Sequence, residues 1–193
     1  MKTKIISSIL LLNILFANSQ EKDFNKKSNT KESSVAKSKS LDTGMQLFEK
    51  DNYSIQYPKK WKMESPGSLG EAFCIMGPKE EEYVYVNLIQ EEESKQWLNK
   101  SFNEYVEHQV KSFADFFKVT KTEKIENNLY KIEFDTVMEG EILKSIRYFY
   151  LTDKKDIYLL TFCARDNFFN TYLQQGDTII KSFKINNQLM NVK

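Results

Sequence analysis

The residue types that most often perform catalysis or bind metals are scarce in this chain of 193 residues. It contains one histidine, His108, and two cysteines, Cys74 and Cys163. A structural zinc site needs four such ligands at characteristic spacings, and this chain lacks them. A Ser-His-Asp triad would have to use His108, and no Gly-x-Ser-x-Gly pattern occurs. We therefore predict that the protein is not an enzyme and has no catalytic, cofactor-binding or metal-binding residues.

Carboxylates are the remaining source of chemistry. Candidate groups are Glu91-Glu92-Glu93, Asp135, Glu139 and Glu141. Two acids can serve a hydrolase, and an acid-lined loop can bind calcium, although no spacing matches an EF-hand loop. Charged loops at strand ends are the simpler interpretation. An enzyme that uses paired acids remains an alternative.

The N-terminus indicates export. Met1 to Lys4 are basic at two positions, an uncharged apolar run of about a dozen residues follows, and Ala17-Asn18-Ser19 supplies small residues for cleavage. A membrane-spanning helix needs about 20 apolar residues. We predict a cleaved signal peptide at 1–19 and a periplasmic or secreted protein, since no cysteine follows the apolar run to accept a lipid.

Oxidising surroundings allow a disulfide, but both cysteines lie in apolar runs, so buried free thiols are the first interpretation and a bridge is the alternative.

Composition separates the rest of the chain into parts. Residues 20–42 are rich in Lys, Ser, Asn and Glu, which predicts a disordered linker. We expect one domain at 43–186 and a tail at 187–193. The domain is mildly acidic and has only Arg147 and Arg165 as arginines. Nucleic-acid binding relies on basic residues that neutralise phosphates, so it is not expected.

Hydrophobic periodicity predicts the elements that would position any site. Alternation or apolar runs predict strands at 45–48, 52–57, 72–76, 83–89, 119–125, 129–138, 142–151 and 157–164. Residues 129–138 are apolar on one face only, which is typical of a strand near an edge. Residues 157–164 are apolar on both faces, so layers should cover both sides of the sheet.

Two helices supply those layers. Ser101 and Glu104 match a capping box, and aromatic and aliphatic residues at helical spacing follow them up to Phe117. This stripe has no basic opposite face, so core packing is favoured over stable membrane contact. A second helix, capped by Asp166 or Asn167, has its inner face at Phe168, Phe169, Tyr172, Leu173, Gly176, Ile179, Ile180 and Phe183. Gly176 indicates either close approach to the sheet or a helix break. The fold class is α+β: an antiparallel sheet of about seven strands with helices on both faces.

Two local patterns carry a family resemblance. Tyr53 to Trp61, with Tyr57-Pro58 two residues before Trp61, resembles the opening of PsbP-like and DcrB-like proteins. The ending, with Ser182-Phe183, is similar to that family's last strand and helix. The resemblance covers about residues 45–185 and implies a three-layer α/β/α sandwich used for binding, with the matching residues structural. Members include a photosystem extrinsic subunit, a nuclear-import factor that binds the Ran GTPase, envelope lipoproteins and secretion chaperones. This chain lacks the acylated cysteine of the lipoproteins.

These observations lead to two functional hypotheses besides the acid enzyme. The first is an exported, non-catalytic accessory module that recognises a protein partner in the cell envelope, through a sheet edge or a cleft between helix and sheet. The second is a carrier of a small apolar ligand held between the long aromatic helix and the sheet.

Overall fold

The computed structural model describes residues 37–40, 44–50, 52–68, 70–91, 100–185 and 188–189. The predicted signal peptide and the first part of the predicted linker lie outside these residues. Among the described residues, no helix combines the length and apolar character needed to cross a membrane.

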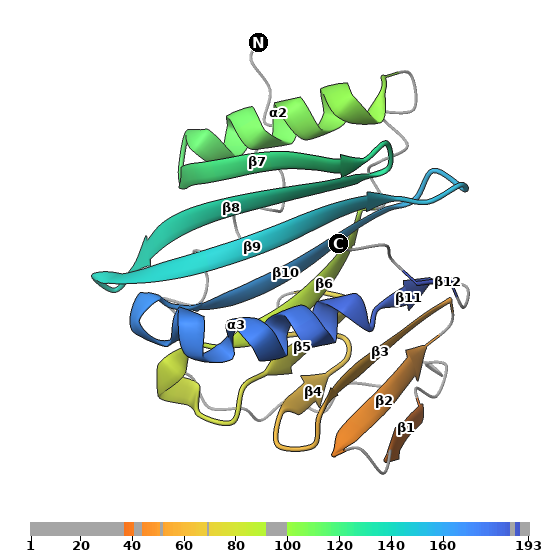
Figure 1. Ribbon diagram of the computed structural model, residues 1–193, viewed down its shortest axis with the longest axis vertical. Helices are drawn as coiled ribbons and strands as arrows, with labels where there is room; N and C mark the ends of the chain where they lie inside the picture. The colour runs from red at the N-terminus through yellow and green to blue at the C-terminus, as the bar shows by residue number, and fades with distance from the viewer. Residues whose placement is uncertain are drawn as a thin grey trace, which may run out of the picture. The chain divides into compact units, whose positions relative to one another are not determined.

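The main sheet has seven strands in the order β4-β5-β6-β10-β9-β8-β7, and every neighbouring pair is antiparallel (Figure 1). Glu139 and Gly140, both with positive φ, form the tight turn between β8 and β9, as expected for a two-residue hairpin. The predicted strands are confirmed. β4 is an addition, because three residues are too few for a hydrophobic pattern to indicate a strand. The strands are β4 (Lys62–Glu64), β5 (Phe73–Met76), β6 (Tyr85–Glu91), β7 (Lys118–Glu126), β8 (Leu129–Met138), β9 (Glu141–Leu151) and β10 (Ile157–Arg165).

A second, smaller sheet contains the first and last strands of the described chain. Its order is β1-β2-β3-β11-β12, so the predicted hairpin of 45–48 and 52–57 forms here and not in the main sheet. The strands are β1 (Lys37–Ser40), β2 (Met45–Lys50), β3 (Tyr53–Pro58), β11 (Lys184–Ile185) and β12 (Gln188–Leu189). Two of them lie outside the predicted domain range. β1 lies within the predicted linker, where it pairs antiparallel with β2, and β12 lies within the predicted tail, where it pairs antiparallel with β11.

Two α-helices cover opposite faces of the main sheet (Figure 1). Helix α2 (Phe102–Ala114) begins at the predicted capping box, since Ser101 accepts the Glu104 amide and the Glu104 carboxylate accepts the Ser101 amide. Helix α3 (Asp166–Lys181) begins differently from the prediction: its N-cap is Arg165, without a side-chain cap. Asp166 instead lies in the first turn, where its negative charge interacts favourably with the positive end of the helix dipole. Its Oδ1 also forms an ion pair with Nζ of Lys144 at 2.6 Å.

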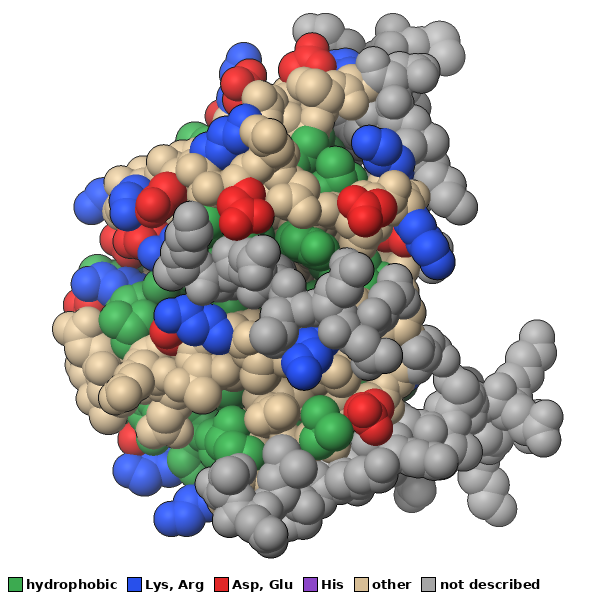
Figure 2. Space-filling model, turned by 45° about the vertical axis from the view of Figure 1, so that its right-hand side comes forward, with side chains coloured by type: hydrophobic (Ala, Val, Ile, Leu, Met, Phe, Trp, Pro, Cys, Tyr) green, Lys and Arg blue, Asp and Glu red, His purple; other side chains and the backbone are tan. Residues whose placement is uncertain are grey.

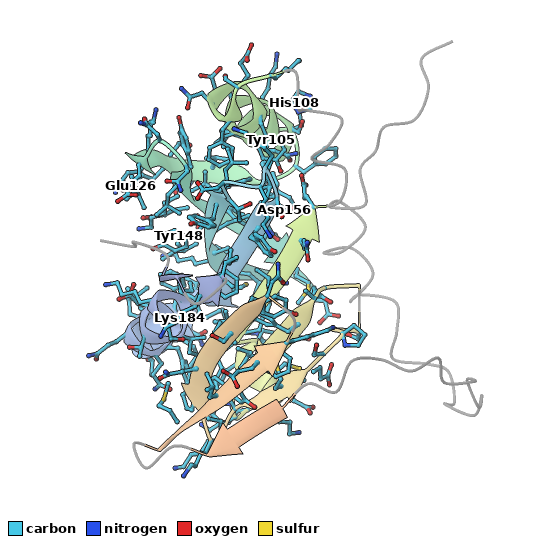
Figure 3. All side chains as sticks on the ribbon, turned by 90° about the vertical axis from the view of Figure 1, so that its right-hand side faces the viewer. Tyr105, His108, Glu126, Tyr148, Asp156 and Lys184 are labelled. Atoms are coloured by element: carbon cyan, nitrogen blue, oxygen red, sulfur yellow. The ribbon has the colours of Figure 1, made fainter. Side chains whose placement is uncertain are left out.

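Alternation along β9 shows which helix lies on which face. Phe149 and Arg147 meet rings of α2, namely Tyr105 and Phe113. The intervening residues Ile146 and Tyr148 join the opposite layer with α3, on whose side Tyr148 is seen in Figure 3. The sheet is therefore a partition between two packed layers, which confirms the predicted arrangement of helices on both faces.

The larger core lies between the main sheet, α3 and the small sheet. It includes the residues of β10 that face α3 together with the inner face of α3, and Phe183 and Ile55 are fully buried in it. Ser182 ties the layers together, because its hydroxyl accepts the Gln56 amide at 2.8 Å and lies 3.1 Å from the Gln56 carbonyl oxygen. Helix α3 runs unbroken through Gly176, so of the two interpretations of that glycine the structure shows close approach.

Candidate functional site

A groove of about 490 Å³ runs between α3 and the strands β8, β9 and β10. It exists because α3 packs on β10 and β9, and because most of the same face of β8 and β7 has no covering helix or strand among the described residues. Buried and half-buried apolar side chains form its floor: Ile146, Phe162, Phe169, Leu173 and Ile180. Polar side chains form its rim: Lys131, Glu133, Asn170, Gln174 and Asp177. An apolar floor with a few polar groups is typical of ligand and peptide sites.

Tyr148 places a phenol on the sheet side of the groove. Burial, assisted by the nearby carboxylates of Asp177 and Glu133, raises the pKa of Tyr148 to about 12. The phenol is therefore neutral at physiological pH and has a proton to donate. A carbonyl or carboxylate oxygen of a bound molecule is the complementary group.

The uncovered wall beside the groove carries paired charges. Lys131 and Glu133 of β8 form an ion pair at 2.7 Å, and Lys121 and Glu123 of β7 form another at 2.7 Å. The β7–β8 register sets Lys121 opposite Glu133 and Glu123 opposite Lys131, so each charge has an opposite charge beside and across from it. Interspersed basic and acidic side chains are also visible over the face shown in Figure 2. Such a wall suits a partner that carries charges of both signs.

The other face of the sheet contains a buried charge that the sequence analysis did not single out. Arg147 is 4% exposed, its Nε donates to the Thr161 hydroxyl at 2.8 Å, and its guanidinium lies 4.9 Å from the Phe113 ring centre. Its Nη1 has no hydrogen-bond partner. Burial lowers the pKa of Arg147 from its ordinary value. The only signal in the sequence was an arginine placed between the apolar residues Ile146 and Tyr148.

The two cysteines are free and buried, as first predicted. Cys74 on β5 and Cys163 on β10 lie on either side of β6. Strands are about 4.8 Å apart, so their Cα atoms are separated by roughly 10 Å, beyond the reach of a disulfide. Burial raises the pKa of Cys74 to about 12 and also raises that of Cys163. These thiols are core residues without the ionised form that nucleophilic chemistry needs.

The predicted acidic residues are not brought together. Glu91 ends β6 near Leu151 of β9, where its carboxylate accepts the Tyr105 hydroxyl. Glu139 and Glu141 lie at the opposite end of β9, about 30 Å away for a strand of this length. Glu92 and Glu93 lie outside the described residues. Within the described residues, no three His, Cys, Asp or Glu side chains form a group that could hold a metal.

His108 and Trp61 also have clear positions. His108 is exposed on α2 (Figure 3). Trp61 is 3% exposed, stacks edge-on against Tyr172, and donates from Nε1 to Gln175 at 3.3 Å. The residues that matched the family pattern are therefore core residues or tie layers together, which agrees with their expected structural role.

The small-ligand hypothesis placed its cavity beside the long aromatic helix, α2, whereas the groove described above lies beside α3. Tyr105, Val106 and Phe113 of α2 are buried against the sheet, with Phe113 and Phe134 ring centres 5.2 Å apart. The described groove lies at α3, on the other face. The signal that could have located the groove is the polar face of residues 129–138, because two charged residues of β8 on that face line the groove.

No family model and no curated protein matches this sequence. Solved structures do match. The cyanobacterial PsbP (CyanoP) of Synechocystis sp. PCC 6803 has a TM-score of 0.50 at 10% identity, covering 83% of this chain and 98% of that one. The Ran-binding protein Mog1p of Saccharomyces cerevisiae has a TM-score of 0.50 at 7% identity, covering 80% of this chain and 97% of that one. At these identities the likeness concerns the fold alone, and it confirms the resemblance found in the sequence: this chain has the PsbP-like fold.

Proposed function

We propose that this protein is an exported, non-catalytic binding module that recognises a protein partner through the α3 groove. The observation that carries the proposal is the groove itself: an open, apolar floor beside a neutral phenol and a wall of alternating charges. A protein segment offers apolar side chains, carbonyl groups and charges together, so it can satisfy all three features at once.

Two further observations support the proposal. Mog1p, which shares the fold, is a Ran-binding protein, so protein recognition is one use of this architecture, although a fold alone does not select a function. The pattern of residues 1–19 supports export to the cell envelope or beyond. Export makes a partner in that compartment the expected target.

Site-specific photocrosslinking in the native host tests this proposal. A photoreactive residue at Asn170, on the groove rim, should give a discrete crosslinked product, and one at Glu107, exposed on α2, should not. Leu173→Arg should abolish the Asn170 product by placing a charge on the apolar floor. Equal crosslinking from both positions, or a product unaffected by Leu173→Arg, would contradict recognition through the groove.

A carrier of a small apolar ligand is the second candidate function. The groove volume of about 490 Å³ and its aromatic and aliphatic floor favour it, since small-molecule sites commonly occupy 300–1,000 Å³. Native mass spectrometry of protein purified from its own host separates the two candidates. A reproducible bound molecule that is lost in Leu173→Arg would support the carrier, and its absence would leave the protein partner favoured.

A further inference from the structure

Strand β7 forms one edge of the seven-stranded sheet, and no strand among the described residues pairs with its outer side. The five consecutive residues from Thr120 to Lys124 are all exposed. A nine-residue edge strand to which no described strand is bonded on its outer side can accept another strand by main-chain hydrogen bonding. The question is which strand would fit it.

Four of the five charged residues of β7 are arranged symmetrically about Thr122. Each position along β7 can be given by the residue of β8 with which it pairs, and Thr122 pairs with Ile132. Lys121 and Glu123 pair with Glu133 and Lys131, one position to either side of Ile132. A lysine and a glutamate are therefore equally distant from Thr122, in opposite directions.

The outer pair of charges repeats this arrangement. Lys118 and Glu126 pair with Asp135 and Leu129, which lie three positions to either side of Ile132. The two irregularities of β7 fall one on each side of Thr122, between Val119 and Lys121 and between Lys124 and Glu126. Each half of the strand thus contains one extra residue, and the symmetry is preserved.

These four charged side chains also lie on one face of the sheet. Their partners on β8 are residues 129, 131, 133 and 135, which alternate with the positions that face α2. Lys118 and Lys121 are therefore on the same side as Glu123 and Glu126, the side of α3. An antiparallel copy of this strand would set Lys118 and Lys121 opposite Glu126 and Glu123, and opposite charges directly across from each other stabilise strand pairing. Lys124, the fifth charged residue of β7, lies on the α2 face and would be opposite Val119.

We propose that two copies of this protein associate edge to edge through β7, antiparallel and with the twofold axis at Thr122. In this dimer Lys121 of each copy faces Glu123 of the other, and Lys118 faces Glu126. The two main sheets become continuous, and a twofold axis makes the same patch serve both copies. The groove itself is lined from α3, β8, β9 and β10 and not from β7, although the Lys121–Glu123 pair also belongs to the charged wall beside it.

Charge reversal tests the dimer without disturbing the core. Sedimentation velocity of the full chain, over micromolar to millimolar concentrations, should show a monomer–dimer equilibrium. Lys121→Glu and Glu123→Lys should each weaken self-association about tenfold or more, since each sets like charges opposite one another at two symmetric places. Lys111→Glu, the same charge change on an exposed position of α2, should have no effect.

Mixing the two variants gives the decisive measurement. An equimolar mixture of Lys121→Glu and Glu123→Lys restores opposite charges at both places, so heterodimers should form with about the affinity of the unaltered protein. The double variant Lys121→Glu/Glu123→Lys should also regain self-association. A wild type that stays monomeric throughout the concentration range would overturn the proposal, and so would a dimer insensitive to the single changes or a mixture that fails to associate.

Discussion

At Gly176 helix α3 closely approaches the Phe162 ring of β10, and replacing this glycine with alanine should destabilise the protein. A Cβ at this position would lie 2.5 Å from Cδ2 of Phe162 and 2.7 Å from Cε2 and Cγ of the same ring. Phe162 is 1% exposed and packs against Phe169 at 5.4 Å, so its ring has little room to move. Inserting a methyl group into such a core costs about 1–3 kcal/mol.

Helix propensity opposes this cost, and the magnitudes decide the sign. Alanine favours a helix over glycine by about 1 kcal/mol. With the crowding cost near the upper end of its range, Gly176→Ala should lose about 2 kcal/mol of unfolding free energy, or roughly 4–8 °C in Tm for a domain of this size.

Urea unfolding followed by circular dichroism gives the assay. Thr171→Ala, at an exposed position of the same helix, is the matched control and should be neutral or slightly stabilising. Phe162→Leu should reduce the cost of Gly176→Ala in the double variant, because the ring that obstructs the methyl group is gone. If Gly176→Ala were as stable as the wild type, the close approach of α3 to β10 would not be the reason for glycine at this position.

Three other changes are expected to have measurable effects. Ser101→Ala should cost about 1 kcal/mol in urea unfolding, since it removes the α2 cap; an unchanged midpoint would show that the cap contributes nothing. Burial raises the pKa of Cys74 to about 12, so this thiol stays protonated in the folded protein at pH values where it ionises in the unfolded chain. The contribution of Cys74 to the free energy of unfolding is therefore full below about pH 8.5 and falls by about 1.4 kcal/mol per pH unit as the pH rises toward 12. The loss of stability between about pH 7 and pH 10 should be smaller in Cys74→Ala, and an equal loss would argue against a buried thiol. Thr161→Val should cost about 1–3 kcal/mol because the buried Nε of Arg147 loses its acceptor, and the cost should disappear in an Arg147→Met background; a cost that persists there would assign it to packing.

The sequence predicted the elements of the main sheet well because their burial is strongly patterned. Strand β10 has apolar side chains on both of its faces, and eight of its nine residues are buried. Such a strand fits only in the middle of a sheet that is covered on both sides. The Ser101 cap was equally specific, since two side chains three residues apart form reciprocal bonds with two amides. Local chemistry of this kind can be read without knowing the rest of the fold.

Other features depended on long-range contacts that no local pattern contains. Strand β11 joins the small sheet by pairing with β3, from which it is separated by more than 120 residues in the sequence. The alternation of Tyr53 to Tyr57 therefore predicted a strand without indicating the sheet to which it belongs. The groove was missed for a related reason. Its position depends on where α3 ends its contact with the sheet, and the one-sided polarity of β8 indicated an open face without showing what lies beside it.

The separation of two layers by a single sheet explains how chains with almost unrelated sequences can share this architecture. Neighbouring residues of β9, such as Arg147 and Tyr148, belong to different layers, so the strand tolerates exchange of one side chain for another of similar character at each position. It does not tolerate a change in length, because one inserted residue would transfer every later side chain to the wrong layer. Insertions and deletions in relatives should therefore occur mainly at the tips of the hairpins, such as Glu139-Gly140. The alternation of side chains between the two layers should be kept even where the residues themselves differ.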